Sequence, residues 1–282
     1  MRAEQFFHDF FEREKIELYG SLSLDDCKII RPYLLERCGV TAGSAVVFAV
    51  PYYSRSAESE KRNVSLYAVP RDYHLYFKEL GQRFASAFSE SFPDAKFGFF
   101  SDHSPIDEVN AAAKTGLGII GRNHLLITEK YSSFIFLGEI VTDLELPSDP
   151  SEIKLCESCG LCSDTCPVDL SVEACLSALT QKKGELTEKE KAKILDHGLV
   201  WGCDRCQTAC PHTQRAIRNE TIYSPVDFFS EKCLPELSAE LVEKMPDEDF
   251  EARAYSWRGK ETVLRNLRLF ESEKHLEDGS NK

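Results

Sequence analysis

Eight of the eleven cysteines in this 282-residue chain follow one spaced pattern. A run of the form Cys-x2-Cys-x2-Cys-x3-Cys-Pro comes first, a single cysteine follows, and a shorter run, Cys-x2-Cys-x3-Cys-Pro, comes last. In chain order these residues are Cys156, Cys159, Cys162, Cys166, Cys175, Cys203, Cys206 and Cys210. Thiolates are soft ligands that hold iron and sulfide well, and short spacings place neighbouring sulfurs around one cluster. The pattern therefore predicts iron–sulfur clusters.

The first run has the spacing found in bacterial ferredoxins, where the cysteine before proline binds the second of two clusters. Eight ligands then imply two [4Fe–4S] clusters. The crossing rule assigns to one cluster Cys156, Cys159, Cys162 and Cys210. It assigns to the other cluster Cys166, Cys203, Cys206 and one more thiolate. A symmetric motif would place that ligand at Val200, so we expect Cys175 to complete the second cluster.

Zinc and disulfides are the alternatives to iron–sulfur clusters. Paired Cys-x2-Cys also suits tetrahedral zinc, but the four-cysteine run followed by proline is more specific to clusters. The chain opens with Met1-Arg2-Ala3-Glu4 and shows no apolar signal segment there. We therefore expect a cytoplasmic protein in a reducing compartment, where disulfides are rare.

The composition indicates a globular, strongly acidic protein. The hydrophobic fraction is 42%, with 18 Phe and 10 Tyr, which is sufficient for a large core. No stretch approaches the roughly 18 apolar residues of a membrane-spanning helix, so no membrane partner is expected. The formal net charge is −13. Such a chain repels nucleic-acid phosphates at long range and suits a basic partner or a small substrate.

Hydrophobic periodicity and turn residues predict an α+β fold. Helices are expected at residues 5–15, 23–38, 73–92, 105–114, 187–195 and 261–276. Strands are expected at residues 45–51 and 96–101, and a hairpin from residues 125–128 and 134–141. A proline-rich break at residues 146–150 then separates a first domain, residues 1–150, from the cysteine region, residues 151–216, and a helical extension, residues 217–282.

Three further segments contain residue types suited to a site: residues 67–74, 101–108 and 116–123. Each also has a plain structural interpretation. Asp72 would begin a helix, Asp102 would cap the helix at 105–114, and the glycines would form a turn. The glycine run is similar to a phosphate-binding loop, although no strand–turn–helix context supports that interpretation.

Together with the cysteines, these segments resemble the epoxyqueuosine reductase family, cobalamin-dependent iron–sulfur enzymes that complete queuosine in tRNA. The resemblance runs from about residue 67 to residue 270. Besides the eight cysteines, it rests on Asp72-Tyr73-His74, Asp102 with Pro105, Gly116-x-Gly118 with Gly121 and Asn123, Phe136-Leu137-Gly138-Glu139, Gly202-Cys203-Asp204-x-Cys206-Gln207 and Arg265-Asn266.

The resemblance implies a cobalamin-binding, flavin-reductase-like first domain and a bacterial-ferredoxin-like domain with two [4Fe–4S] clusters. It implies a cobalamin site that includes Asp72, Tyr73, Gly116, Gly118, Gly121, Arg122 and Asn123. The clusters would pass electrons from a low-potential donor of the ferredoxin or flavodoxin type. Asp102 matches the family's proposed general acid. Such an acid needs a raised pKa, through burial or a neighbouring carboxylate such as Asp107 or Glu108.

Two departures from the family pattern affect these expectations. The family has lysine where this chain has Arg122, which replaces a point charge by a planar fork. The chain also stops about twelve residues after Phe270, where the family continues into helical repeats that help to grip tRNA. We therefore expect a short form of the family that lacks these repeats. A tRNA substrate is in doubt for it, because the net charge of −13 disfavours binding to tRNA.

The other cysteines and histidines have plainer interpretations. Cys27, Cys38 and Cys233 are expected to be buried apolar residues. His103 and His124 are expected to pack or hydrogen-bond, with axial cobalt ligation or proton relay as the alternative.

The leading function is thus an iron–sulfur and cobalamin-dependent reductase of the epoxyqueuosine reductase type. An electron carrier without chemistry of its own is one alternative, and a corrinoid reductase acting on another substrate is a second. A carrier needs neither Asp102 nor the glycine segment, so these features favour an enzyme.

Overall fold

The computed structural model describes residues 2–280, with side chains described as far as residue 272. The chain has an α+β fold and forms two compact units. The first comprises Met1–Tyr53, Tyr76–Gly160 and Cys210–Val226. The second comprises Ser54–Leu75, Leu161–Ala209 and Asp227–Lys282. Each unit is therefore assembled from three separate segments of the chain.

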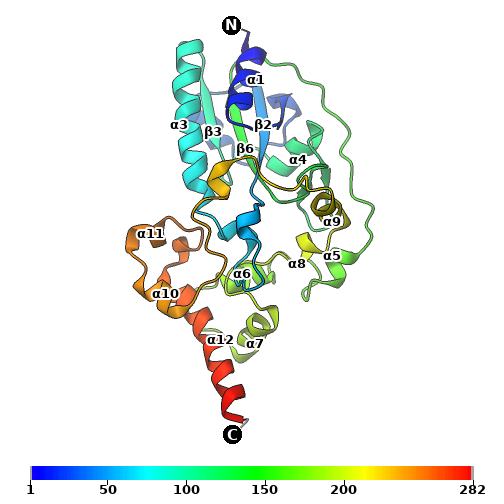
Figure 1. Cartoon of the computed structure of the whole chain (residues 1–282). Coiled ribbons are helices and arrows are strands. Elements are labelled where there is room, and N and C mark those ends of the chain that lie inside the picture. The colour runs from blue at the N-terminus through cyan, green and yellow to red at the C-terminus, as the bar shows by residue number, and fades with distance from the viewer. Residues whose placement is uncertain (1, 281–282) are drawn as a thin grey trace. The chain divides into compact units, whose positions relative to one another are not determined.

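A four-stranded antiparallel sheet organises the first unit (Figure 1). Its spatial order is β1 (Leu18–Ser23), β2 (Ser44–Pro51), β6 (Ile135–Thr142) and β3 (Phe97–Phe100). Every residue of β2 is buried, because this central strand is covered on both faces. In the register, Glu139 of β6 lies opposite Val47 of β2 and Phe100 of β3.

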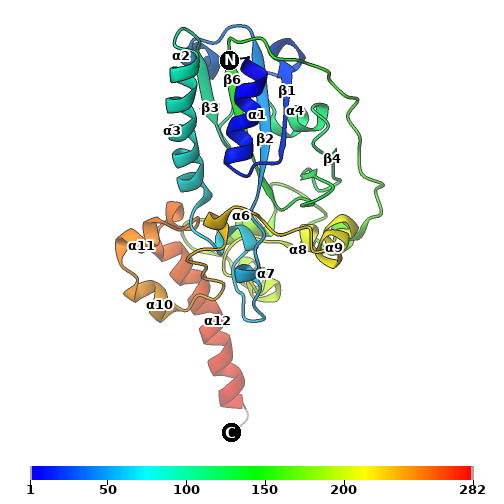
Figure 2. The same cartoon turned by 45° about the horizontal axis from the view of Figure 1, so that its top comes forward.

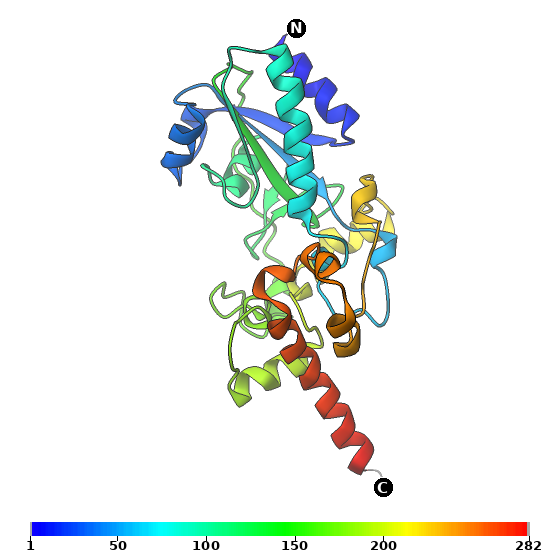
Figure 3. The ribbon, with the colours of Figure 1, turned by 90° about the vertical axis from the view of Figure 1, so that its left-hand side faces the viewer.

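Phenylalanine fills one face of this sheet. Helix α1 (Ala3–Arg13) and helix α3 (Tyr73–Ser91) cover that face, as Figures 2 and 3 show. The ring of Phe84 lies edge-on to Phe10 at 5.2 Å, and Phe11 lies 5.1 Å from Phe48 of the sheet. Aromatic rings of this size bury a large apolar area, so they hold both helices against the strands.

Smaller residues fill the opposite face. Helix α2 (Pro32–Cys38), the short turn η1 (Leu24–Asp26) and helix α4 (Glu108–Lys114) contribute Leu34, Leu24 and Ala112 to this core, where they meet Val47 and Val141. A small two-stranded sheet of β4 (Ile119–Ile120) and β5 (Leu126–Ile127) follows α4.

Helix α9 (Pro211–Arg218) also belongs to the first unit, although it is distant in sequence. The hydroxyls of Thr213 and Ser132 lie 2.7 Å apart, and the Thr221 hydroxyl donates to the Lys130 carbonyl at 3.0 Å. These bonds fix the chain directly after Cys210 on the loop that precedes β6.

The second unit is built from short helices and turns. They are α5 (Leu161–Asp164), α6 (Leu176–Thr180), α7 (Glu188–His197), α8 (Arg205–Thr208), α10 (Ala239–Lys244), α11 (Asp247–Glu251), α12 (Lys260–Ser280), η2 (Arg55–Ala57), η3 (Leu66–Ala68), η4 (Asp227–Phe229) and η5 (Ser256–Arg258). Trp201 and Tyr255 are fully buried and lie edge-on to each other, so they form the centre of this unit.

Most of the expected elements are confirmed, including the α+β class. Two expectations were wrong. Residues 23–38 do not form one helix, because Ser23 ends strand β1 and caps only the turn η1 before α2 begins at Pro32. The expected hairpin does not form either, because β5 pairs with β4 while β6 joins the central sheet. In residues 2–280, no helix has both the length and the apolar character that a bilayer crossing requires.

Candidate functional site

Asp102 lies in the loop between β3 and α4 and does not cap the helix. Its φ is +60°, a left-handed conformation that is uncommon for a non-glycine residue. The residue is exposed. The cap of α4 is Asp107, whose side chain accepts a hydrogen bond from the Asn110 peptide N–H. The interpretation of Asp102 as a helix cap was therefore wrong.

The loop that carries Asp102 is anchored on residues 28–33. Arg31 Nη1 donates to the Ser104 carbonyl at 2.9 Å, and Lys28 Nζ donates to Asp107 Oδ2 at 2.9 Å. The peptide N–H groups of residues 30 and 31 both donate to the Pro105 carbonyl. These hydrogen bonds fix residues 104–107, the part of the loop that follows Asp102.

Exposed apolar side chains border this loop. Ile30 is 44% exposed and Tyr33 is 51% exposed, and the Tyr33 hydroxyl lies 2.7 Å from His103 Nε2. Large apolar residues left in solvent beside polar groups are common at ligand-binding surfaces. His103 thus has a hydrogen-bond partner, as its plainer interpretation predicts.

Two glutamates are buried beneath the same loop. Glu139 of β6 is 0% exposed, and Glu108 begins helix α4. Both carboxylate oxygens of Glu139 and Oε2 of Glu108 are buried without a well-aligned hydrogen-bond partner among the described residues. The Glu108 carboxyl and the Ser104 hydroxyl lie beside Glu139.

Burial and charge act in the same direction on these two carboxyls. Burial raises the pKa of Glu139 well above its ordinary value, the negative charge of Glu108 adds to the rise, and the Ser104 hydroxyl opposes it. Burial also raises the pKa of Glu108; the adjacent Glu139 carboxyl and the charge of Arg31 oppose the rise, and the charges of Asp102 and Asp107 add to it. Burial and the repulsion between the two carboxylates therefore both favour a proton on this pair.

The glycine segment forms the turn between β4 and β5. The Gly121 peptide N–H donates to the Leu125 carbonyl at 2.8 Å, and the His124 N–H donates to the Gly121 carbonyl at 2.9 Å. A Cβ at Gly118 would lie 2.5 Å from the Ile127 carbonyl oxygen, so only glycine fits there. The segment is a strand–turn–strand, which excludes the strand–turn–helix geometry of a phosphate-binding loop.

The same turn contacts the first cysteine of the pattern. The Arg122 peptide N–H donates to Cys156 Sγ at 3.3 Å, and the Cys156 N–H donates to the Ile120 carbonyl at 3.0 Å. Asn123 closes the turn by accepting a bond from the Leu125 N–H at 3.4 Å. The Arg122 side chain itself is exposed. Residues 120–122 therefore position the Cys156 thiol.

A hollow of about 330 Å³ opens beside the glycine segment. Gly116, Gly118, Lys154, His212 and Arg215 contribute to its lining. This volume is at the lower end of the range for small-molecule sites, so the hollow suits part of a large cofactor. Gly116, at the edge of the hollow, has a φ of +78°, which glycine adopts without the strain that a Cβ would cause.

The eight cysteines are divided between the two units. The first unit contains Cys156, Cys159 and Cys210. The second contains Cys162, Cys166, Cys175, Cys203 and Cys206. All four ligands expected for the second cluster therefore belong to one unit.

Within the second unit, helices α5 and α8 are in contact, and they carry Cys162 and Cys206. Burial raises the pKa of the Cys203 thiol to about 12. The Arg205 peptide N–H opposes this rise, and the charges of Asp204, Cys175 and Cys206 add to it. Cys175 and Cys206 therefore lie close to Cys203. The Leu170 N–H donates to Cys166 Sγ at 3.3 Å. This is a second hydrogen bond from a peptide N–H to a cysteine sulfur, like the one at Cys156.

Asp204 joins the second cysteine run to residues 62–66. Its carboxylate accepts hydrogen bonds from Arg62 Nη1 at 2.8 Å, the Ser65 hydroxyl at 2.5 Å and the Leu66 N–H at 3.0 Å. The side chain is 3% exposed. Three charge-assisted bonds in a buried place fix the backbone between Cys203 and Cys206.

Asp72 and Tyr73 lie at the start of helix α3, in the part assigned to the second unit. Asp72 Oδ1 accepts a bond from the His74 N–H at 2.9 Å and lies 2.8 Å from His74 Nδ1. This geometry agrees with the plain interpretation of Asp72 as a residue that begins a helix. A role of Asp72 and Tyr73 in binding cobalamin stays a prediction.

The remaining expected residues have structural contacts. Cys27, Cys38 and Cys233 are half-buried, and each thiol donates to a nearby carbonyl. Asn266 is 0% exposed and donates to the carbonyls of Thr180 and Val200. It ties helix α12 to the chain before Cys203.

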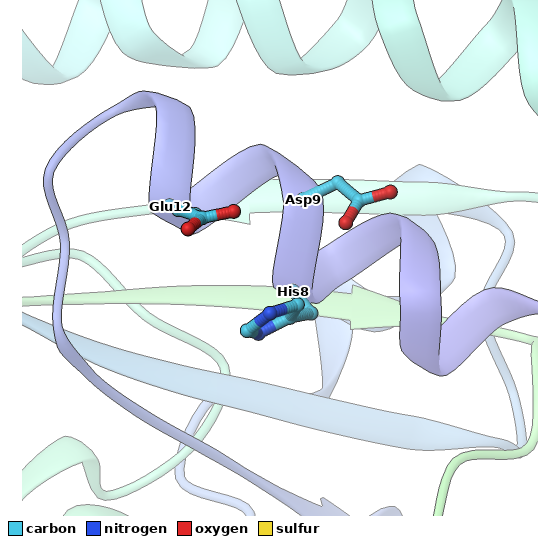
Figure 4. A group of neighbouring side chains, drawn as sticks. All are labelled: His8, Asp9 and Glu12. Atoms are coloured by element: carbon cyan, nitrogen blue, oxygen red, sulfur yellow. The ribbon is translucent and has the colours of Figure 1, made fainter.

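A separate group of side chains on α1 contains possible metal ligands (Figure 4). Ligand atoms of His8, Asp9 and Glu12 lie within 4.8 Å of one another, and all three residues are exposed. Asp9 accepts a bond from Gln5 Nε2 at 2.7 Å, and His8 Nδ1 lies 2.8 Å from the Tyr19 hydroxyl. Exposed groups of this kind are common on helix surfaces, and we assign this one no role.

Sequence reasoning missed the importance of Glu139 and of residues 28–33. Glu139 belongs to a quoted motif, but only the register of β6 shows that its side chain is buried next to Glu108. A glutamate inside a run of strand-forming apolar residues was the available signal, since charged residues are rarely fully buried without a partner.

Comparisons with known proteins agree with the resemblance. A family model described as "Epoxyqueuosine reductase QueG, DUF1730" matches residues 35–103. An epoxyqueuosine reductase from Lactococcus garvieae is 29% identical over 268 residues, which cover 91% of this chain and 73% of the relative. One from Synechocystis sp. is 31% identical over 226 residues, which cover 76% of this chain and 78% of the relative.

A solved structure of an epoxyqueuosine reductase with an epoxyqueuosine-modified tRNA-Tyr stem loop superposes with a TM-score of 0.74. It is 22% identical and covers 95% of this chain and 81% of that chain, so it shows a shared fold. The share of the relative's length that this chain covers differs from one relative to the next. It covers only 61% of a Listeria monocytogenes epoxyqueuosine reductase that is 30% identical.

Proposed function

The chain belongs to the epoxyqueuosine reductase family, oxidoreductases of queuosine tRNA modification, and we propose that it reduces the epoxide of epoxyqueuosine in tRNA to an alkene. The observation that carries this proposal is the exposed Asp102 loop above two buried carboxyls, in a family member that has all eight cysteines. An epoxide opens readily when an acid protonates the departing oxygen, and a positioned carboxyl group can supply that proton.

We propose two [4Fe–4S] clusters as resident cofactors. Their ligand sets are Cys156, Cys159, Cys162 with Cys210, and Cys166, Cys175, Cys203 with Cys206. The residues fit such clusters, because peptide N–H groups donate to the Cys156 and Cys166 sulfurs. Hydrogen bonds to cluster sulfurs are one means by which a protein sets the reduction potential. The clusters would supply single electrons from a low-potential donor of the ferredoxin or flavodoxin type.

Cobalamin is the second cofactor that we propose, on the basis of family membership. Gly116 and Gly118 line the hollow beside β4. The resemblance adds Gly121, Arg122 and Asn123, which follow in the same turn. The resemblance adds Asp72 and Tyr73 as cobalamin contacts. When bound, the cofactor would supply the low-valent cobalt chemistry that attacks or reduces the epoxide.

The protein's own groups would hold and move protons. Asp102 would protonate the opened oxygen, and its loop would be kept in place by Arg31 and Asp107. The proposed organisation assigns cobalamin binding, on a flavin-reductase-like fold, to residues 1–150. It assigns the ferredoxin-like double-cluster domain to residues 151–216 and a helical extension to residues 217–282. A tRNA substrate rests on the solved complex of a relative with a modified stem loop.

A reductant-consumption assay tests this function. The reconstituted protein would receive a coloured one-electron donor and tRNA with or without epoxyqueuosine, under anaerobic conditions. We expect oxidation of two donor molecules per epoxide, because removal of the oxygen takes two electrons. Donor oxidation that does not depend on the modified tRNA would favour the electron-carrier alternative.

A further inference from the structure

The oxygen of an epoxide leaves as water only after it has received two protons. The balanced reaction joins the epoxide, two electrons and two protons to give the alkene and water, with both C–O bonds broken and two O–H bonds formed. A carboxyl group such as Asp102 holds one transferable proton. On the proposed function, the site therefore needs a second proton source close to Asp102.

The buried glutamates have the burial and the contacts for that role. Glu139 lies on the central sheet with no exposed surface, and the Glu108 carboxyl and the Ser104 hydroxyl lie beside it. Because its oxygens have no well-aligned partner among the described residues, an ionised Glu139 would be a buried and poorly compensated charge. A proton shared between the two carboxyls removes that cost.

Two acidic groups near the pair favour retention of this proton, while one nearby cation opposes it. Asp102 and Asp107 place further negative charge near Glu108. The nearby cation Arg31 opposes them, but its guanidinium donates to the Ser104 carbonyl. Lys28 pairs with Asp107 at the surface and is well exposed to solvent. Asp102 lies in the loop that leads into α4, where Glu108 is the first residue, and its charge adds to the rise of the Glu108 pKa.

We propose that Glu139 and Glu108 share one proton and form a relay that reprotonates Asp102 within each catalytic cycle. Asp102 gives its proton to the opened epoxide oxygen and becomes a carboxylate. The pair then passes its proton from Glu108 to Asp102, which delivers it as the oxygen leaves as water. Solvent afterwards refills the pair. The two glutamates act through Asp102, so they are positioning and relay residues.

An infrared measurement tests the shared proton without any turnover. A protonated carboxyl has a carbonyl band that is separate from the carboxylate bands. We expect this band at pH 7 in the full-length wild-type protein and in the control Glu90→Gln, which changes an exposed residue of α3. Glu139→Gln should remove the band. Glu108→Gln should keep it, because a lone buried Glu139 stays protonated. An unchanged band in Glu139→Gln would overturn the shared proton.

Turnover over a range of pH tests the relay itself. In Glu139→Gln and Glu108→Gln, kcat on epoxyqueuosine tRNA should fall roughly 10²-fold, the lower end for proton-transfer contributions, with KM, iron content and cobalamin content unchanged. The solvent deuterium effect on kcat should rise, which a merely structural defect would not cause. A wild-type pH profile and rate in Glu139→Gln would overturn the relay. An inactive wild-type protein would instead overturn the proposed function, and the relay with it, whatever the infrared band shows.

Discussion

Asp102 combines exposure, a left-handed backbone and two buried carboxyls beneath its loop. A left-handed backbone is uncommon for a residue other than glycine, and such conformations are often found in functional loops. Asp107, and not Asp102, caps helix α4. Loss of the Asp102 carboxylate should therefore affect chemistry and leave the helix intact.

Asp102→Asn should separate these roles. The amide keeps the shape and tolerates the left-handed conformation, so the free energy of unfolding should change by less than about 1 kcal/mol. The transferable proton is lost, so kcat should fall by roughly two to four orders of magnitude with iron and cobalamin content unchanged. Asp107→Asn, which preserves a cap, serves as the matched control. Near-wild-type kcat in Asp102→Asn would remove this residue from the mechanism.

Glu139→Gln should change how stability depends on pH. The pKa of Glu139 is raised in the folded protein, so above its unfolded value of about 4.3 the folded state binds more protons than the unfolded chain. This contribution to stability is full at low pH and decreases as pH rises toward the folded pKa. Relative to wild type, the variant should gain up to about 1.4 kcal/mol per pH unit from about pH 5 up to the folded pKa of Glu139. Urea unfolding at several pH values measures this, and a pH-independent difference would contradict it.

Among single residues, the sequence identifies those whose chemical role follows from their type and spacing. The cysteines and Asp102 are of this kind. Glu139 is not of this kind, because its role depends on the register of β6. That register places the Glu139 side chain on the face of the sheet where Glu108 lies. Such a long-range pairing is not encoded in any local pattern.

Among the elements, the segment around Cys175 tests the second cluster. Cys175 precedes helix α6 and lies close to Cys203. Cys175→Ser should lower the iron content from about eight to about four atoms per chain, because one of two clusters loses a thiolate ligand. Cys233→Ser, which changes a half-buried thiol that donates to the Phe229 carbonyl, should keep all the iron. Full iron in Cys175→Ser would show that another residue completes the cluster.

The turn that precedes α8 depends on the buried Asp204. Asp204→Ala removes three hydrogen bonds and leaves Arg62 without its anion, so we expect a loss of about 3–5 kcal/mol in the free energy of unfolding. Asp196→Ala is the matched control, since Asp196 is 79% exposed and lies 3.9 Å from Arg205. That control should change stability by less than about 1 kcal/mol. Equal losses in the two variants, measured by urea unfolding, would contradict the role of Asp204.

Elements with a strong local signal are predictable from the sequence, and those defined by distant partners are not. The capping box of Thr187 and Glu190 forms as its residues suggest, and α7 begins there. Strand β1 has only one buried residue, so its sequence lacks the alternation of a half-buried strand. Its identity comes from pairing with β2 along six residues, from Leu18 to Ser23.

For the whole molecule, charge and family membership point in different directions. A net charge of −13 disfavours long-range attraction of tRNA, whereas a relative of the same fold has been solved with a modified stem loop. The two agree if recognition depends on contacts to the modified nucleoside and its loop at short range. Salt then screens the repulsion between the protein and phosphates.

Nucleoside analysis after reaction tests the central claim most directly. Protein reconstituted anaerobically with iron, sulfide and cobalamin would be incubated with a reductant and tRNA that contains epoxyqueuosine, and the digested nucleosides would be identified by mass spectrometry. We predict conversion of epoxyqueuosine to queuosine that requires both cobalamin and reductant and is lost in Asp102→Asn. Unchanged epoxyqueuosine after incubation with fully loaded, reducible protein would contradict the assignment of this chain as an epoxyqueuosine reductase.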